Sequence, residues 1–392
     1  MRTRNWVWGL RLYAVLLLGI PVGAAAQQKQ TERNVVWQIG DFDQTSREFG
    51  HNYDLESDTL KPVFIVGQSE TADWPASQMS SVNGSSGKHA VPYTILFKME
   101  KPTAGNYRLT IAALLVNPSV PDLLVEINGH AGRYFFNRKI SYYAGDDRVD
   151  SPIYGGDTLE IDFPGKFLKA GENQLVLTAV EDTENPEMQA SLIYDALKLT
   201  EMGNGKLEPV ASMKPTVFYR QKDGQTYEVV DVTVTSAENL NSGQVELSVG
   251  RERLHAALGT ANDFGQERLE FEVPEFSGAV AAKVEIHANG RTYPSSATIS
   301  PERKWTIYFV PHAHLDIGYT DYQAKVGELQ SRNIDKLLAF LPKNPEMRFS
   351  LDGSWVGQNY FATRDEEAKK QFLRYAKDGK IGVPAQYANL LT

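Results

Sequence analysis

The chain has 392 residues, and its 49 acidic side chains outnumber 40 basic ones, so its formal net charge is −9. Without basic clusters, this charge argues against binding to nucleic acid or to an anionic membrane surface. The sequence contains no cysteine, which excludes disulfides and thiolate metal sites, and its length allows two or three domains.

Residues 1–26 have the pattern of a secretory signal peptide. Three arginines lie before residue 12, a short apolar run follows, and three alanines end at Ala26, the predicted cleavage site. The apolar run is short for a bilayer span, so we expect a secreted or periplasmic protein with no integral membrane segment after cleavage. An uncleaved membrane anchor is the alternative.

Residues 33–200 show short alternating runs of β-branched and apolar residues, separated by Gly, Pro, Asn and Asp. This pattern, with no long helical period, predicts a β-sandwich. Asn128-Gly129 is a hairpin-turn signal. The predicted strands are Val35–Ile39, Tyr93–Phe97, Tyr107–Ala112, Leu123–Ile127, Leu175–Leu177 and Ile193–Leu199.

Three stretches of this region, V-V-W-Q-I-G-D-F-D-Q-T-S-R-E-F (35–49), G-E-N-Q-L-V-L (171–177) and Y-D-A-L-K-L (194–199), resemble a known module. They are similar to the carbohydrate-binding-type sandwich appended to rhamnogalacturonan lyases. The resemblance implies a jelly-roll, carbohydrate-binding-like domain at 33–200. Nothing in the chain resembles the catalytic part of those lyases.

Aromatic side chains in this region are candidates for stacking against sugar rings, because their flat apolar faces suit pyranose C–H groups. For each of them a place in the core is the alternative, and Trp37, which alternates with Ile39, is expected to face inward. The candidates are Trp37, Tyr53, Trp74, Tyr142, Tyr143 and Tyr154.

Residues 205–300 follow a linker signal at Gly203-Asn204-Gly205 and again read as strands. Their length and alternation predict a small immunoglobulin-like β-sandwich that acts as a spacer. Asp223-Gly224 and Asn289-Gly290 are hairpin-turn signals. The predicted strands are Thr216–Tyr219, Tyr227–Thr235, Gln244–Val249, Leu269–Val273 and Ala282–Ala288.

A possible metal site opens the region 305–392. Thr306–Val310 is β-branched and aromatic, which predicts a buried strand, and His312, His314 and Asp316 follow it. Residues two apart in extended chain point to the same side, so these imidazoles and this carboxylate suit one divalent ion such as zinc. A polar strand end with solvated histidines is the alternative.

The rest of this region alternates helical and strand patterns. An apolar stripe from Ile334 to Leu341 predicts a helix, Arg348–Leu351 a strand, and Thr363-x-x-Glu366 a capping box that opens another helix. Ile381–Val383 is a further predicted strand. This order is typical of a parallel α/β sheet or barrel, and we expect residues 305–392 to be its N-terminal part, in a fragment of a longer enzyme.

The run V-P-H-A-H-L-D-I-G-Y resembles the opening motif of the family 38 glycoside hydrolases, the retaining α-mannosidase class. The resemblance implies that His314 and Asp316 bind zinc, with His312 as a further candidate. It also implies that Tyr319, where the family has Trp, stacks on the bound sugar. Asp352, which follows the second predicted strand, is a weak catalytic candidate, and Trp355 lines either a sugar subsite or the core.

These resemblances predict an exported, metal-dependent retaining glycosidase of α-mannosides or related glycans, with an N-terminal glycan-binding module. Retaining hydrolysis needs two carboxyl groups about 5–5.5 Å apart, and the family's nucleophile is expected beyond Thr392, so we expect this chain alone to be inactive. A non-catalytic exported glycan-binding protein is the second hypothesis. A polysaccharide lyase, which would release an unsaturated product, is the third.

Overall fold

The computed structural model describes residues 34–51, 62–84, 87–115, 120–136, 155–180, 190–240, 242–259, 262–319 and 321–388. The predicted signal peptide and its cleavage site at Ala26 lie outside these residues. The chain divides into two compact units, Met1–Arg303 and Lys304–Thr392. Among the described residues, no helix is both long enough and apolar enough to cross a membrane.

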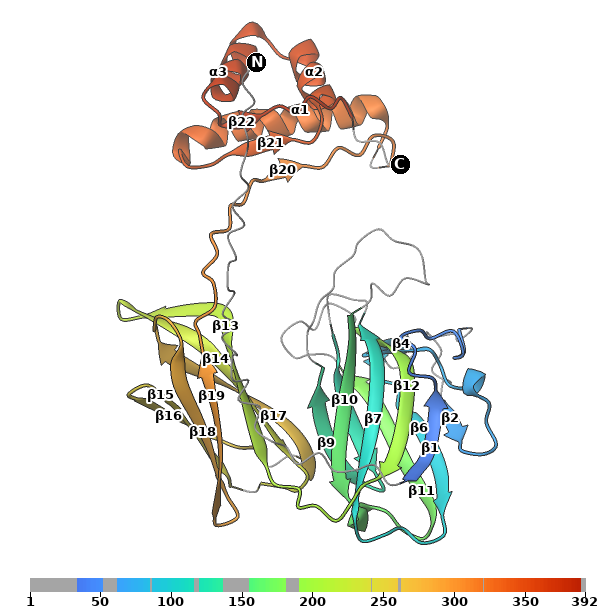
Figure 1. Ribbon diagram of the computed structural model, residues 1–392. Coiled ribbons are helices and arrows are strands. Elements are labelled where there is room, and N and C mark those ends of the chain that lie inside the picture. Colours follow the sequence, from blue (N-terminus) through green and yellow to red (C-terminus); the bar gives the residue numbers. More distant parts are fainter. Residues whose placement is uncertain are drawn as a thin grey trace, which may run out of the picture. The chain divides into compact units, whose positions relative to one another are not determined.

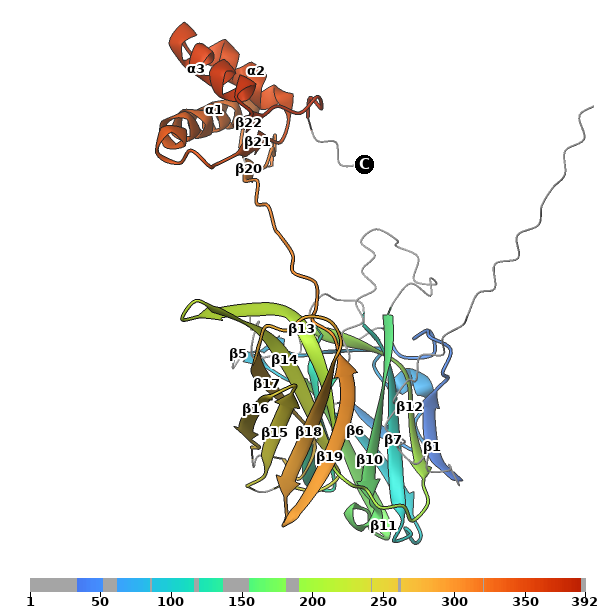
Figure 2. The same cartoon turned by 60° about the vertical axis from the view of Figure 1, so that its left-hand side comes forward.

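The first unit consists almost entirely of β-strands, arranged as two modules that each have their own core (Figures 1 and 2). The first module contains short 3-10 turns at Thr71–Asp73 and Gly165–Phe167. Its strands are β1 (Asn34–Gly40), β2 (Val63–Ile65), β3 (Ser77–Met79), β4 (Val82–Gly84), β5 (Gly87–His89), β6 (Tyr93–Met99), β7 (Asn106–Leu115), β8 (Asp122–Ile127), β9 (His130–Phe135), β10 (Gly155–Pro164), β11 (Gly171–Val180) and β12 (Ser191–Glu201).

Two layers enclose the core of the first module. One layer has the strand order β1-β12-β7-β10, with β3 beside β12, and the other has the order β9-β8-β11-β6-β2. Every second residue of β11 is buried from Asn173 onward, as alternation predicts, whereas β7 is buried along almost its whole length. Both layers contribute apolar side chains to one cluster. Six predicted strands, from Val35–Ile39 to Ile193–Leu199, lie within observed strands and are confirmed.

The second module has the same layered construction. A sheet with the order β16-β15-β18-β19 faces β13, β14 and β17 across a core of aliphatic side chains and Phe271. Its five predicted strands also lie within observed strands. The strands are β13 (Val210–Lys222), β14 (Gln225–Ser236), β15 (Gln244–Val249), β16 (Glu252–Ala257), β17 (Phe264–Pro274), β18 (Val280–Ala288) and β19 (Arg291–Ile299).

Three predicted hairpin turns are confirmed by their backbone angles. Asn128 has φ 49° and Gly129 φ 90°, and the Asp223-Gly224 and Asn289-Gly290 pairs likewise have positive φ at both positions. This is the conformation that two-residue hairpins need, because its twist matches that of the flanking strands. The turns join β8 to β9, β13 to β14 and β18 to β19.

The two modules of the first unit share one eight-stranded sheet, which the sequence did not predict. β17 of the second module runs parallel to β9 of the first through the pairs Phe264↔Gly132 and Gly265↔Arg133. A Cβ at Gly132 would lie 2.8 Å from the Phe264 carbonyl oxygen, and a Cβ at Gly265 would lie 2.7 Å from that of Arg133. The two backbones therefore approach as closely as they do because both positions are glycine.

The second unit combines a three-stranded sheet with three α-helices (Figure 1). The sheet order is β20-β21-β22, and both neighbouring pairs are parallel. Leu337, Trp355, Tyr360 and Phe372 are among the side chains of its core. The elements are β20 (His312–Ala313), α1 (Gln323–Phe340), a 3-10 turn (Leu341–Lys343), β21 (Phe349–Leu351), α2 (Ser354–Thr363), α3 (Glu366–Lys377) and β22 (Ile381–Gly382).

The predicted buried strand Thr306–Val310 is wrong. Its residues form no strand, and the Tyr308 and Phe309 side chains are 85% and 86% exposed. The ladder with β21 begins only at His312, so the preceding apolar residues have no neighbouring strand among the described residues to pair with. The parallel pairing of the three strands is nevertheless present.

The start of α3 also differs from the prediction. Asp365 caps the helix, because its side chain accepts a hydrogen bond from the Ala368 backbone N–H, whereas Thr363 is the last residue of α2. Helix α2 itself was not predicted: its apolar and polar residues follow no clear helical period. Gly379, with φ 68°, follows the end of α3, where the left-handed conformation favours glycine.

Candidate functional site

The candidate site lies where two parallel strands of the second unit end. In the register between β20 and β21, His312 pairs with Ser350 and Ala313 with Leu351. His314 and Asp352 each follow directly after the last residue of their strand. The carboxyl ends of parallel strands are where α/β sheets place functional side chains, and this register brings an imidazole and a carboxylate together there.

His314 and Asp352 form a close pair. Nδ1 of His314 lies 3.2 Å from Oδ2 of Asp352. The same oxygen accepts a hydrogen bond from the Leu315 backbone N–H at 2.8 Å, and Gln330 Nε2 donates to the His314 carbonyl oxygen at 3.0 Å. Backbone and ring at this position are therefore held from both sides, by the end of β21 and by α1.

The pair leaves one imidazole nitrogen available. Nδ1 of His314 faces the Asp352 carboxylate, so a neutral ring that donates an Nδ1–H to this carboxylate carries its lone pair on Nε2. The Asp352 side chain is 16% exposed and that of His314 is 71% exposed. The carboxylate thus lies behind a ring that is open to solvent, an arrangement common for metal-binding histidines.

The other motif residues, His312 and Asp316, flank His314 along the chain. His312 is exposed and Asp316 is half-buried. Within the described residues, no group of three or more His, Asp or Glu side chains is arranged to hold a metal ion. Imidazole and carboxylate donors nevertheless suit a divalent ion such as zinc, so the residue types of His314 and Asp316 fit one.

The two candidate sugar-contacting residues differ sharply in exposure. Tyr319, next to Gly318 at φ 99°, is 90% exposed, so its ring face is open. Trp355 lies at the start of α2, is 6% exposed and belongs to the core of this unit. Of the two roles predicted for Trp355, its placement favours the core.

The aromatic candidates of the first unit that the structure describes are both core residues. Trp37 is 4% exposed, as its alternation with Ile39 predicts, and Trp74 is fully buried. The Trp74 ring packs edge-on against Tyr93 and Tyr194, with centroids 5.5 Å apart in both cases. The remaining candidates, Tyr53, Tyr142, Tyr143 and Tyr154, lie outside the described residues.

Two segments of the chain match known family models. Residues 304–386 match the N-terminal domain of the family 38 glycosyl hydrolases. Residues 35–199 match the CBM-like domain III of polysaccharide lyase family 4. Both resemblances inferred from the sequence, and their order along the chain, are confirmed. The family 38 segment contains the His314–Asp352 pair, and the CBM-like segment covers nearly all of the first module.

No curated protein matches the chain. Solved structures that match include a putative beta-galactosidase from Bacteroides fragilis, which is 12% identical with a TM-score of 0.20; the match covers 76% of this chain and 46% of that one. A GH2 beta-galacturonidase from Eisenbergiella tayi is 12% identical with a TM-score of 0.20, covering 78% and 63%. An exo-chitosanase from Amycolatopsis orientalis is 10% identical with a TM-score of 0.21, covering 76% and 35%. The chain thus spans less than two thirds of each.

Proposed function

We propose that this chain is part of an exported, metal-dependent, retaining glycoside hydrolase that acts on α-mannosides or related glycans. The observation that carries the proposal is the His314–Asp352 pair, which lies at two adjoining strand ends within the family 38 segment. The match of residues 35–199 supports a glycan-binding role for the first module.

In this proposal each residue of the motif has a separate role. His314, through Nε2, and Asp316 are the metal ligands, and His312 is a further candidate. Asp352 holds the His314 ring and favours the proton on Nδ1. A bound divalent ion supplies Lewis-acid contacts to sugar hydroxyl oxygens. Tyr319, with its ring open to solvent, offers an apolar face to the sugar.

Metal-dependent sugar binding tests this function. Methyl α-mannoside is titrated into the full chain after treatment with EDTA and again after zinc is restored, with saturation-transfer NMR as the readout. We expect binding only with zinc, and loss of that binding in Asp316→Asn. The matched control is Asp321→Asn, since Asp321 lies near the motif but forms an ion pair with Lys325. Mannoside binding that ignores both EDTA and Asp316→Asn would contradict the proposal.

The second candidate function is glycan binding without catalysis, which the CBM-like match favours. It predicts that the full chain binds oligosaccharides equally well with and without EDTA, and that Asp316→Asn has no effect. Isothermal titration with mannans and pectic oligosaccharides measures this. Absence of heat with every glycan, at concentrations where the chain is folded, would leave the first module with a structural role only.

A further inference from the structure

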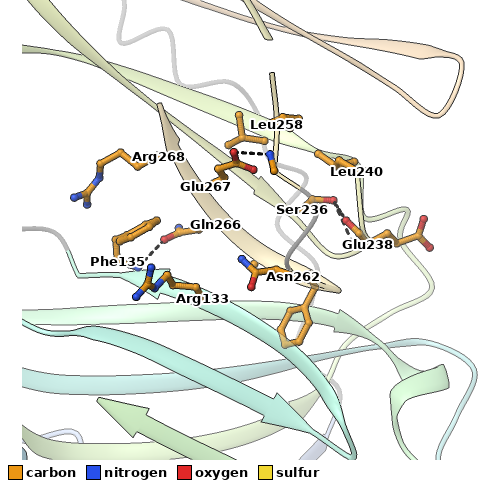
Figure 3. A pocket seen from close by; sticks show the side chains of 14 residues that line it. Arg133, Phe135, Ser236, Glu238, Leu240, Leu258, Asn262, Gln266, Glu267 and Arg268 are labelled. Carbon is orange, nitrogen blue, oxygen red and sulfur yellow. Dashed lines mark hydrogen bonds between the residues drawn. The ribbon is translucent and has the colours of Figure 1, made fainter. Parts of the chain in front are cut away.

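A pocket of about 290 Å³ lies at the seam between the two modules of the first unit, where β9 and β17 pair (Figure 3). We call it the seam pocket. Its wall combines Arg133 and Phe135 of β9 with residues of β14 and β17 and of the loops around Leu240 and Asn262. Both modules contribute to it, and the close backbone approach at Gly132 and Gly265 holds the two walls together.

One positively charged side chain of the wall, Arg268, forms no ion pair with the described residues. Its guanidinium carbon lies over the Phe135 ring, 4.3 Å from the ring centroid (Figure 3). A guanidinium that contacts an aromatic face keeps N–H donors that suit the two oxygens of a carboxylate.

The second positively charged side chain of the wall is Arg133, which lies on the same face of β9 as Phe135, two residues away. Its buried Nε forms an ion pair with Asp122, whose Oδ2 lies 3.4 Å away. The Arg133 side chain is 33% exposed, so a ligand in the pocket would meet its terminal guanidinium nitrogens rather than Nε.

The acidic side chains of the wall already have partners. Glu267 Oε1 accepts a hydrogen bond from the Gly259 backbone N–H at 2.7 Å, and Glu238 Oε1 lies 3.2 Å from Lys166 Nζ. Gln266 is also occupied, since its Oε1 accepts from the Phe135 backbone N–H. Of the positively charged side chains in the wall, Arg268 is the one that forms no ion pair with the described residues, and Arg133 adds a second positive charge beside its contact with Asp122, in a chain that is acidic overall.

The volume of the seam pocket and its uncharged lining residues indicate what the ligand contains besides a carboxylate. The volume is at the lower end of the roughly 300–1,000 Å³ typical of small-molecule pockets, which suits a single sugar ring or the end of an oligosaccharide. Ser236 and Asn262 add polar groups, and Leu240 and Leu258 add apolar ones. We propose that the seam pocket binds an acidic saccharide, a sugar ring with a carboxylate that Arg268 and Arg133 recognise.

A matched pair of ligands tests this without any variant. Methyl β-glucuronide and methyl β-glucoside differ only in a carboxylate in place of a hydroxymethyl group. Isothermal titration of the full chain, with inorganic phosphate as a third ligand, should give binding of the glucuronide at least tenfold tighter than that of the other two. Equal affinity for the glucoside would overturn the role of the carboxylate, and equal affinity for phosphate would overturn the role of the sugar.

Substitution of Arg268 tests whether the glucuronide binds in the seam pocket. Arg268→Gln should weaken glucuronide binding at least tenfold, and Arg268→Lys, which keeps the charge but loses the planar donors, should weaken it by a smaller factor. Arg253→Gln is the control, because Arg253 is an exposed arginine paired with Glu246 and lies outside the pocket. Unchanged glucuronide binding in folded Arg268→Gln or Arg268→Lys would overturn the proposal. EDTA should have no effect, which separates this site from the metal site proposed in the second unit.

Discussion

Asp352 Oδ2 lies 3.2 Å from His314 Nδ1 and 2.8 Å from the Leu315 backbone nitrogen. One carboxylate oxygen thus fixes both the ring of a predicted metal ligand and the backbone that follows it. From the sequence, Asp352 was predicted to lie at a strand end, as a catalytic candidate without an assigned role. The structure gives it the geometry of a positioning residue, because parallel register places it beside His314.

Asp352→Asn should therefore lower zinc affinity without unfolding the second unit. The substitution keeps the shape and one acceptor oxygen but removes the negative charge behind the imidazole. Loss of such a partner typically weakens metal binding by about 10–100-fold, and we expect the lower end of that range. Competition with a chromophoric chelator measures the affinity, and Asp321→Asn is the control. Identical zinc affinities for Asp352→Asn and the wild type would rule out the positioning role.

Trp74→Ala should destabilise the first module strongly. The indole is fully buried between Phe64, Tyr93 and Tyr194, so truncation leaves a large cavity. Such substitutions cost about 3–5 kcal/mol in the free energy of unfolding. Urea titration followed by circular dichroism measures the change. Phe218→Ala, at a side chain that is 68% exposed, should stay within about 0.5 kcal/mol. A small effect at Trp74 would return it to the candidates for glycan contact.

Gly265→Ala should open the seam between the modules. Gly265 has φ 110°, and a Cβ there would lie 2.7 Å and 2.8 Å from backbone atoms of Arg133. Gly171→Ala separates the two causes, since Gly171 has φ 86° but a Cβ there would meet nothing within 4 Å. Backbone strain alone, as in Gly171→Ala, should lower the free energy of unfolding by about 1–3 kcal/mol. The loss should be larger in Gly265→Ala, because the clash with Arg133 adds to the strain. Equal losses in the two variants would mean that the close approach is not rigid.

The stability of the second module should depend on the ionisation of Glu228. Burial raises the pKa of this carboxyl above its ordinary value of 4.5, although the Glu302 backbone N–H, a donor to Oε1, opposes the shift. Between the ordinary pKa and the raised one, the folded state binds more protons than the unfolded state. The contribution to stability is thus complete below pH 4.5 and is lost as the pH rises through the folded pKa.

Glu228→Gln tests this dependence, because the amide keeps an acceptor for the Glu302 N–H and cannot ionise. Urea titrations between pH 4 and pH 7 should show a smaller decline in the free energy of unfolding for the variant than for the wild type. Burial also raises the pKa of Asp195, but that group is present in both proteins and cancels in the comparison. Parallel curves would show that Glu228 ionises freely in the folded chain.

Much of the first unit could be predicted because its signals are local. Strand alternation along β6 or β15 needs only period two, and Asn128-Gly129 needs only two residues with positive φ. The pairing of β9 with β17 joins residues about 130 positions apart through two residue pairs, and no pattern in either strand predicts it. The seam pocket therefore could not be predicted from the sequence.

The candidate site was predicted in part for the same reason. His314 and Asp316 could be found because their spacing is local, whereas the partner of His314 lies 38 positions along the chain, directly after another strand. Strand propensity failed at Tyr308 and Phe309: β-branched and aromatic residues favour strands only where a neighbouring strand is present. The cap at Asp365 was missed because Thr363, two residues earlier, offered a stronger sequence match.

Zinc X-ray absorption of the loaded full chain tests whether His314 and Asp316 jointly hold a divalent ion. We expect a coordination shell of nitrogen and oxygen with an imidazole contribution at about 2.0–2.1 Å. That contribution should disappear in His314→Ala, and zinc retention after dialysis should fall in both His314→Ala and Asp316→Asn. A wild-type chain that retains no zinc, or variants with the spectrum and zinc content of the wild type, would contradict this assignment.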